Sequence, residues 1–133
     1  ATLARMNILL ATDGSPFSRK MLAYVASNGL WFRPEFSYTV LHVCARVPTS
    51  SSDPAVGVVS EAVHFLRDQI GLQPARALRA GKPAEVIPEF ARQAHCNLIV
   101  MGSHGYSGLE SLMLGSVTQG VLASSHVPVL VVR

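Results

Sequence analysis

Short apolar runs alternate with helical patterns along this chain, and this alternation restricts its fold more than any other feature. The first apolar run is Asn7-Ile8-Leu9-Leu10-Ala11. Its continuous hydrophobicity is typical of a strand that is buried on both faces of a parallel sheet. Further strands are predicted at 36–43, 75–80, 98–101 and 127–132, and the helices between them are predicted to begin near Pro16, Val58, Pro83 and Gln119.

The alternation predicts an α/β fold, because strands and helices joined by short connections form right-handed βαβ units. We expect a three-layer sandwich around a doubly wound, five-stranded parallel sheet with strand order 3-2-1-4-5. A chain of 133 residues is expected to form one domain, 1–133. In such sheets ligands bind at the carboxyl ends of the strands. Asp13, Val43 and Gly102 follow or end the first, second and fourth strands, so these three strand ends are expected to meet in one crevice.

Three prolines give further expectations. Pro16 after Ser15 predicts a capped helix start. Pro88 lies inside the third helix and should kink or break its first turns. Pro128 restricts the last strand to a sheet edge or to a strand start. The segment 48–54 is rich in serine and proline and is predicted to be a mobile loop.

A glycine motif follows the fourth predicted strand. It reads Met101-Gly102-Ser103-His104-Gly105 and continues, nine residues after Gly105, with Gly115-Ser116-Val117-Thr118. Glycines at a strand end and a helix start let the backbone approach a ligand, and the first amides of a helix favour an anion. The hydroxyl groups of the second block add donors. The motif therefore predicts a site for the phosphates of a nucleotide.

The common glycine fingerprints do not fit this chain. A Walker A loop needs a lysine after its last glycine, and no lysine follows Lys82. A dinucleotide fingerprint needs three glycines after the first strand, where this chain has Ala11-Thr12-Asp13-Gly14-Ser15. The glycines could also serve turns alone, although their spacing favours a ligand site. His104 is expected to be structural or to donate to a phosphate, and His42 to be a strand residue packed in the sheet. No Ser-His-Asp order, paired carboxylates or metal cluster emerges, so no catalytic or metal-binding residue is predicted.

The amino-acid composition limits the kinds of partner expected for this chain. The chain is 49% hydrophobic and 14% charged, so it either buries both faces of its sheet or hides apolar surface in an oligomer. Its net charge of +3 is spread over scattered lysines and arginines, which argues against a nucleic-acid surface. No apolar run is long enough to span a membrane and no signal-peptide pattern is present. Two distant cysteines suit a reducing compartment, so we expect a cytoplasmic protein that contacts neither nucleic acid nor membrane.

Several stretches resemble the universal stress protein family, and specifically its ATP-binding branch. The family members that do not bind ATP lack the glycine pattern that is complete here. The resemblance implies a Rossmann-like, adenine nucleotide alpha hydrolase-like fold. It covers nearly the whole chain and is carried by Ile-Leu-Leu-Ala-Thr-Asp-Gly-Ser at 8–15, Leu41-His42-Val43, Asn97-Leu98-Ile99-Val100 with the motif at 101–105, Leu114 with the block at 115–118, and Pro128-Val129-Leu130-Val131-Val132.

The resemblance also implies roles for individual residues. Asp13 would lie near the ribose, the backbone of Val43 would meet the adenine edge, and the glycines would hold the ribose and the phosphates. Tyr106 stands where the family often has a basic residue, and Gly120 and Pro88 should loosen helices that are usually more regular. The full predicted nucleotide-binding set is Ala11, Thr12, Asp13, Val43, Met101, Gly102, Ser103, Gly105, Gly115, Ser116, Val117 and Thr118.

We therefore expect an ATP-binding protein of stress response or signalling with at most slow hydrolysis, and Mg²⁺, if bound, held by the phosphates. Family dimers pair their last strands, which implies a homodimer through 127–132 and leaves open a further, unidentified protein partner. Two alternatives remain. One is a dimerisation or interaction module of the same fold without tightly bound nucleotide. The other is a nucleotidyl hydrolase or transferase of related architecture, although residues 11–15 carry neither of the signatures expected of such enzymes, His-x-Gly-His or Ser-Gly-Gly.

Overall fold

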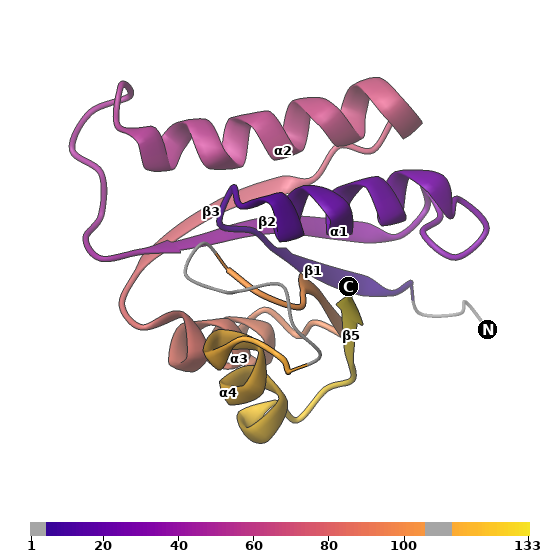
Figure 1. The fold of residues 1–133 in the computed structure, drawn as a ribbon. Coiled ribbons are helices and arrows are strands. Elements are labelled where there is room, and N and C mark those ends of the chain that lie inside the picture. The colour runs from indigo at the N-terminus through magenta and orange to yellow at the C-terminus, as the bar shows by residue number, and fades with distance from the viewer. Residues whose placement is uncertain (1–4, 106–112) are drawn as a thin grey trace.

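The computed structural model describes residues 5–105 and 113–133 as one parallel sheet with helices on both faces (Figure 1). The strand order is β3-β2-β1-β4-β5, and every neighbouring pair is parallel. This confirms the predicted doubly wound α/β fold. In chain order the elements are β1 (Asn7–Ala11), α1 (Pro16–Ser27), β2 (Ser37–Cys44), α2 (Pro54–Ile70), β3 (Ala75–Ala80), α3 (Pro83–Gln93), β4 (Leu98–Gly102), α4 (Ser116–Ser124) and β5 (Val129–Val132).

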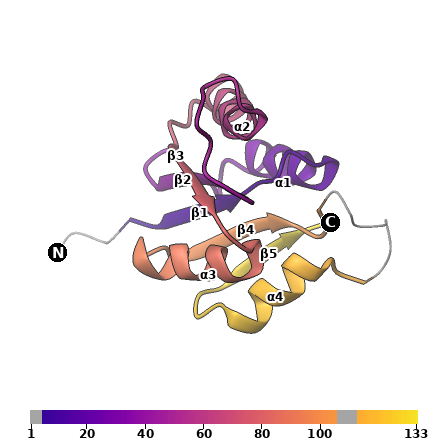
Figure 2. The ribbon, with the colours of Figure 1, turned by 90° about the vertical axis from the view of Figure 1, so that its left-hand side faces the viewer.

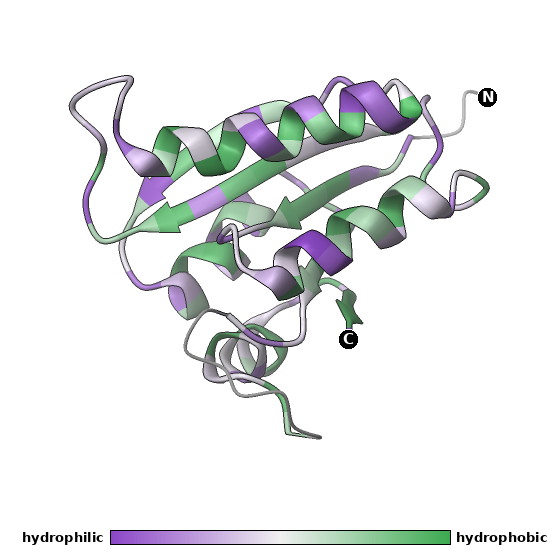
Figure 3. Ribbon diagram, turned by 45° about the horizontal axis from the view of Figure 1, so that its top comes forward, coloured by the Kyte–Doolittle hydropathy of each residue, from purple (hydrophilic) through white to green (hydrophobic). Residues whose placement is uncertain are grey.

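The helices form the two outer layers of the sandwich. Helices α1 and α2 cover one face of the sheet, and α3 and α4 cover the other (Figures 1 and 2). Alternate residues of β1 enter different cores: Leu10 packs with the residues of α1 and α2, whereas Leu9 packs with those of α3 and α4. Both leucines are fully buried, which is why β1 is apolar at successive positions. In Figure 3 the strands are mostly hydrophobic while the helices carry alternating polar and apolar segments.

Helix α2 begins four residues earlier than the sequence pattern indicated. Its first residue is Pro54, and the side chain of Asp53 accepts a hydrogen bond of 2.9 Å from the amide of Ala55. An aspartate cap followed by proline at the first helical position is a standard helix start. The predicted mobile loop at 48–54 therefore ends in this cap. The first apolar residues of the amphipathic pattern lie inside the helix rather than at its start.

Helix α3 is not broken at Pro88. The helix runs from Pro83 to Gln93 and buries Ile87 and Ala91. A proline at this point removes the hydrogen bond to the carbonyl of residue 84, and its ring crowds that carbonyl, yet the helix continues and buries its apolar face. Of the two expected effects, a kink or a break, the break was therefore wrong.

Gly120 has a packing role in α4. A Cβ atom added at this glycine would lie 2.6 Å from the Cβ of Ala84 in α3. The glycine therefore lets the two helices that cover one face of the sheet approach closely.

We expect Gly120→Ala to lower the free energy of unfolding by about 1–3 kcal/mol through overpacking, although alanine is the better helix former. Adding Ala84→Gly to Gly120→Ala should recover part of that loss, because it removes the other Cβ of the contact. Urea unfolding of wild type, both single variants and the double variant measures the coupling. Additive effects of the two substitutions would contradict this account of the glycine.

Strand β5 lies at one edge of the sheet and pairs with β4. It begins at Val129 rather than at Val127, and the carbonyl of Pro128 accepts a hydrogen bond of 3.0 Å from the amide of Ile99. Proline has no amide hydrogen to donate, so Pro128 contributes only its carbonyl oxygen and lies just before the residues of β5 that pair fully with β4. Pro128 was expected at a sheet edge or a strand start; the edge position is confirmed, and Pro128 lies one residue before the strand.

Candidate functional site

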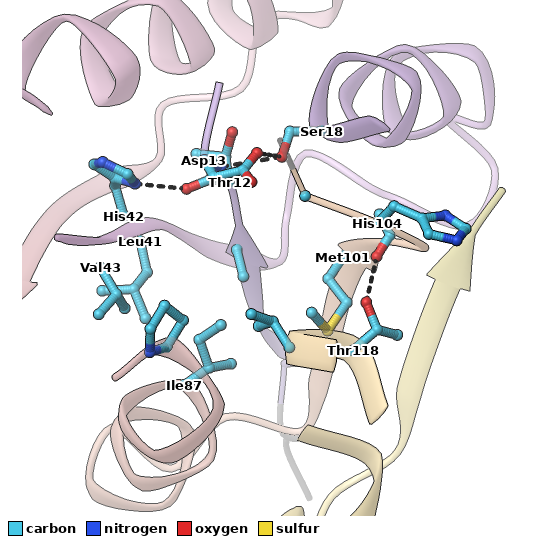
Figure 4. Close-up of a pocket in the computed structure, with 15 residues that line it drawn as sticks. Thr12, Asp13, Ser18, Leu41, His42, Val43, Ile87, Met101, His104 and Thr118 are labelled. Atoms are coloured by element: carbon cyan, nitrogen blue, oxygen red, sulfur yellow. Dashed lines mark hydrogen bonds between the residues drawn. The ribbon is translucent and has the colours of Figure 1, made fainter. Parts of the chain in front are cut away.

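One cavity lies where the strand ends converge, at the carboxyl ends of β1, β2 and β4 and beside the first turn of α4 (Figure 4). Its volume is about 80 Å³, compared with roughly 300–1,000 Å³ for typical small-molecule sites. A larger ligand would therefore place only part of itself inside and extend across the open mouth. The lining residues are Ala11, Thr12, Asp13, Ser18, Leu41, His42, Val43, Pro83, Ile87, Met101, Gly102, His104, Gly105, Val117 and Thr118.

The fold brings most of the predicted nucleotide-binding residues to this cavity. Ser103, Gly115 and Ser116 are absent from the lining. Ser103 and Ser116 adjoin lining residues in the chain, and Gly115 lies close to the backbone of His104, which lines the cavity. Tyr106, predicted to replace a basic residue, lies outside the described residues. The predicted residues that do line the cavity are Ala11, Thr12, Asp13, Val43, Met101, Gly102, Gly105, Val117 and Thr118.

Asp13 has a structural role in the turn after β1 and also faces the cavity. Its Oδ1 accepts hydrogen bonds from the amide of Ser15 at 2.9 Å and from the hydroxyl of Ser18 at 2.8 Å. Its Oδ2 lies where a Cβ on Gly105 would come within 2.8 Å. One carboxylate oxygen therefore holds the turn, while the other is directed toward the glycine motif.

His42 was expected to be packed in the sheet, and the structure places it in the cavity wall. Its Nδ1 lies 3.0 Å from the carbonyl oxygen of Thr12. Because a carbonyl only accepts, Nδ1 carries the hydrogen, and Nε2 of the neutral ring is an acceptor. The position of His42, one residue before Val43 at the same strand end, is the sequence signal that could have identified it.

A second group of lining residues was not predicted from the sequence. Leu41 comes from β2, and Pro83 and Ile87 come from α3. In Figure 4 Leu41, Val43 and Ile87 lie together on one side of the cavity, and Asp13 and Ser18 lie at another. The cavity thus has an apolar side and a polar side. Only the packing of α3 against β2 brings these apolar side chains together.

The glycines of the motif are required by the protein itself. A Cβ on Gly102 would lie 2.8 Å from the carbonyl oxygen of Phe17. A Cβ on Gly115 would lie 3.1 Å from the Cα of His104, and the φ angle of Gly115 is an ordinary −65°. Close approach of backbone to backbone therefore explains these two glycines, whether or not a ligand is present.

His104 joins the two blocks of the motif. Its Nδ1 lies 2.8 Å from the hydroxyl of Ser103, and its Nε2 is hydrogen-bonded to the carbonyl of Met113. The ring is buried and lies 4.8 Å from the ring of Phe17. The amide of Gly115 also donates to the carbonyl of Ser103 at 2.8 Å. Both ring nitrogens are occupied, which supports the structural role expected for His104 over a catalytic one.

The first turn of α4 presents backbone donors. Gly115 is the N-cap residue and provides no side-chain cap. Within the described chain, the amides of Ser116, Val117 and Thr118 have no hydrogen-bond acceptor. The hydroxyl of Thr118 donates to the carbonyl of Gly102 at 3.0 Å, so it is not the spare donor that the sequence suggested. The amides, rather than this hydroxyl, give α4 its capacity to bind an anion.

Few charges lie in the cavity. Among the lining residues, with histidines neutral, Asp13 alone carries a formal charge, and no lysine or arginine is present. The residues 5–105 and 113–133 contain no group of three or more side chains that could hold a metal ion. An anionic ligand would therefore be held by backbone dipoles rather than by cationic side chains.

Comparison with known proteins identifies the family. The model of the universal stress protein family matches residues 4–133. This chain belongs to the universal stress protein family. Universal stress protein YxiE from Bacillus subtilis is 34% identical to it over 95% of this chain and 97% of the relative. Two further curated relatives are longer, and the matched region covers 42% and 46% of their length.

Solved structures of universal stress proteins share the fold. One in complex with cAMP has a TM-score of 0.75 at 22% identity and covers 98% of both chains. The protein from Archaeoglobus fulgidus in complex with dAMP has a TM-score of 0.74 at 20% identity, covering 99% of this chain and 100% of that one. None of the helices in the described part of this chain is long and apolar enough to cross a membrane.

Proposed function

We propose that this universal stress protein binds an adenine nucleotide, and specifically ATP, as a stress-response or signalling protein of the cytoplasm. The observation that carries the proposal is the meeting of three strand ends with the unoccupied amides of α4 in one cavity. The nucleotides bound by its structural neighbours, cAMP and dAMP, support the adenine class.

The two sides of the cavity suggest an orientation for the nucleotide. Leu41, Val43 and Ile87 offer an apolar surface for the base. The carboxylate of Asp13 can accept hydrogen bonds from ribose hydroxyls. The phosphates would then extend across the open mouth toward the amides of residues 116–118, where the positive end of the helix dipole favours them. A Mg²⁺ ion, if bound, would be held by the phosphates.

The direct test is to identify the small molecules released from the purified, denatured protein by mass spectrometry, and to titrate ATP by calorimetry. We expect an adenine nucleotide to be released or ATP to bind. A protein that releases no nucleotide and does not bind ATP, AMP or cAMP would favour the interaction module instead.

We expect ATP hydrolysis to be slow. Phosphoryl transfer needs positioned cations and a group that orients the attacking water, and no lysine or arginine lines the described cavity. Phosphate release from ATP and Mg²⁺ should be far below the roughly 1–10³ per second of ordinary enzymes. Turnover inside that range would make the binding-protein proposal wrong and favour the related hydrolases.

We also propose a homodimer that forms through β5. The strand pairs with β4 on one side, and in the described chain no strand covers its outer edge. Proteins normally cover an apolar edge of this kind. Val129 packs into the core beside α3 and α4, and Leu130 and Val132 pack on the opposite core, whereas Val131 belongs to neither cluster.

Val131→Lys should therefore weaken association without opening either core. Sedimentation of wild type should report about twice the chain mass of 14.2 kDa. The dimer of the variant should have a higher dissociation constant than the wild-type dimer. Arg76→Lys on β3, at the opposite edge, is the matched control and should leave association unchanged. A wild type that is monomeric at micromolar concentration would refute the dimer.

A further inference from the structure

A second cavity lies on the other side of the turn that carries Asp13. It is formed by Thr12 and Gly14 of that turn, by Arg19 and Leu22 of α1, and by one face of α2. That face consists of Val58, Glu61, Ala62 and Phe65, which recur at the spacing of a single helix stripe. Helices α1 and α2 run side by side over the same face of the sheet (Figure 3), and the cavity opens between them.

The cavity is the size of a small ligand. Its space is about 270 Å³, just below the roughly 300 Å³ at which typical small-molecule sites begin. Its volume is larger than the 80 Å³ of the candidate nucleotide cavity. Leu22 and Ala62 form its buried apolar floor, and Val58 and Phe65 are half-buried in its wall. An occupant must therefore be compact and have an apolar body.

Two charged side chains at the rim of the cavity indicate which charged groups a ligand should carry. Arg19 and Glu61 lie on different helices, and both are exposed. Neither side chain makes an ion pair or a hydrogen bond within residues 5–105 and 113–133, although the backbone amide of Arg19 donates to the carbonyl of Ser15 at 3.0 Å. A purely anionic ligand would be repelled by Glu61, and a purely cationic one by Arg19. A molecule with one charge of each sign can pair with both.

We infer that this cavity binds a small zwitterion with an apolar body, the chemical class of free amino acids with aromatic or branched side chains. The carboxylate of the ligand pairs with Arg19, its ammonium group pairs with Glu61, and its side chain lies against Leu22, Ala62 and Phe65. Because Thr12 lines both cavities, the bound amino acid contacts the turn that also faces the candidate nucleotide cavity. The inference concerns this second cavity alone and does not depend on nucleotide binding.

The test is a titration of the full chain with L-phenylalanine, without added nucleotide, followed by the amide resonances of Thr12, Gly14, Leu22 and Ala62. A ligand of this size should bind with a dissociation constant on the order of 1 mM. N-acetyl-L-phenylalanine lacks the ammonium group, and L-phenylalanine amide lacks the carboxylate. Each should bind about two- to fivefold more weakly, since each loses one solvent-exposed charge pair.

Exposed-residue variants separate binding from folding. Arg19→Gln and Glu61→Gln should each weaken L-phenylalanine binding about two- to fivefold, the range for a solvent-exposed charge pair, and Arg46→Gln, an exposed arginine outside the cavity, should leave it unchanged. The inference is wrong if none of the four amide resonances shifts at an L-phenylalanine concentration about ten times the expected dissociation constant. It is also wrong if the shifts occur at Val43 and Gly102 instead, or if the blocked derivatives bind equally well.

Discussion

Gly102→Ala is expected to lower the free energy of unfolding by about 1–3 kcal/mol, the usual range for overpacking. The new Cβ would lie 2.8 Å from the carbonyl oxygen and 2.9 Å from the carbonyl carbon of Phe17. These are backbone atoms in the first turn of α1, so relief requires α1 and β4 to move apart. Asp13 and Ser18 line the candidate nucleotide cavity, and they lie just before and within this first turn of α1. A displacement of α1 should therefore weaken ATP binding as well.

A matched glycine provides the control. Gly57 is exposed on the solvent-facing side of α2, and a Cβ added there would meet no atom within 4 Å. Gly57→Ala should therefore stabilise the protein by about 0.5–1 kcal/mol. Urea unfolding measures both variants. If the two substitutions changed stability in the same direction, the close approach of Phe17 would not be the reason for glycine at 102.

Asp13→Asn is expected to weaken ATP binding about 10- to 100-fold, the range for losing a hydrogen bond to a charged group. Asparagine keeps an Oδ1 that can accept from the amide of Ser15 and the hydroxyl of Ser18, as Asp13 does. The turn should therefore remain, and the change is confined to the charge and to the atom facing Gly105. Calorimetric titration with ATP and with adenosine measures the effect.

The sign of this effect identifies which part of the nucleotide lies beside Asp13. A ribose that donates to the carboxylate predicts the same loss for adenosine and for ATP. Phosphates beside the carboxylate predict the opposite, because removing a negative charge would raise the affinity for ATP. Asp53→Asn alters the cap of α2, outside the cavity, and should leave both affinities unchanged. A gain of ATP affinity in Asp13→Asn would overturn the proposed orientation.

The strands were largely predictable from the sequence. The structure places β1 and β3 at the predicted residues, 7–11 and 75–80. For β1 the reason is that apolar continuity is a local property of a buried parallel strand. Strand β3 is different, because it lies at the sheet edge and is mostly exposed. The start of α2 was not found, because the cap at Asp53 and Pro54 precedes the apolar stripe. The break expected at Pro88 does not occur, because α3 packs its apolar face, including Ile87 and Ala91, on the sheet across that position.

The sequence by itself determined the order of the elements, the parallel sheet and the three strand ends that meet at one crevice. These follow from apolar periodicity and from the handedness of βαβ connections. The tertiary structure alone completed the lining of the crevice. It added His42 beside Thr12 and the apolar wall from α3, and it showed that the hydroxyl of Thr118 is already used by Gly102. It also opened the second cavity between α1 and α2. These contacts join residues far apart in the chain, and their distances depend on how the helices pack against the sheet, which no local pattern specifies.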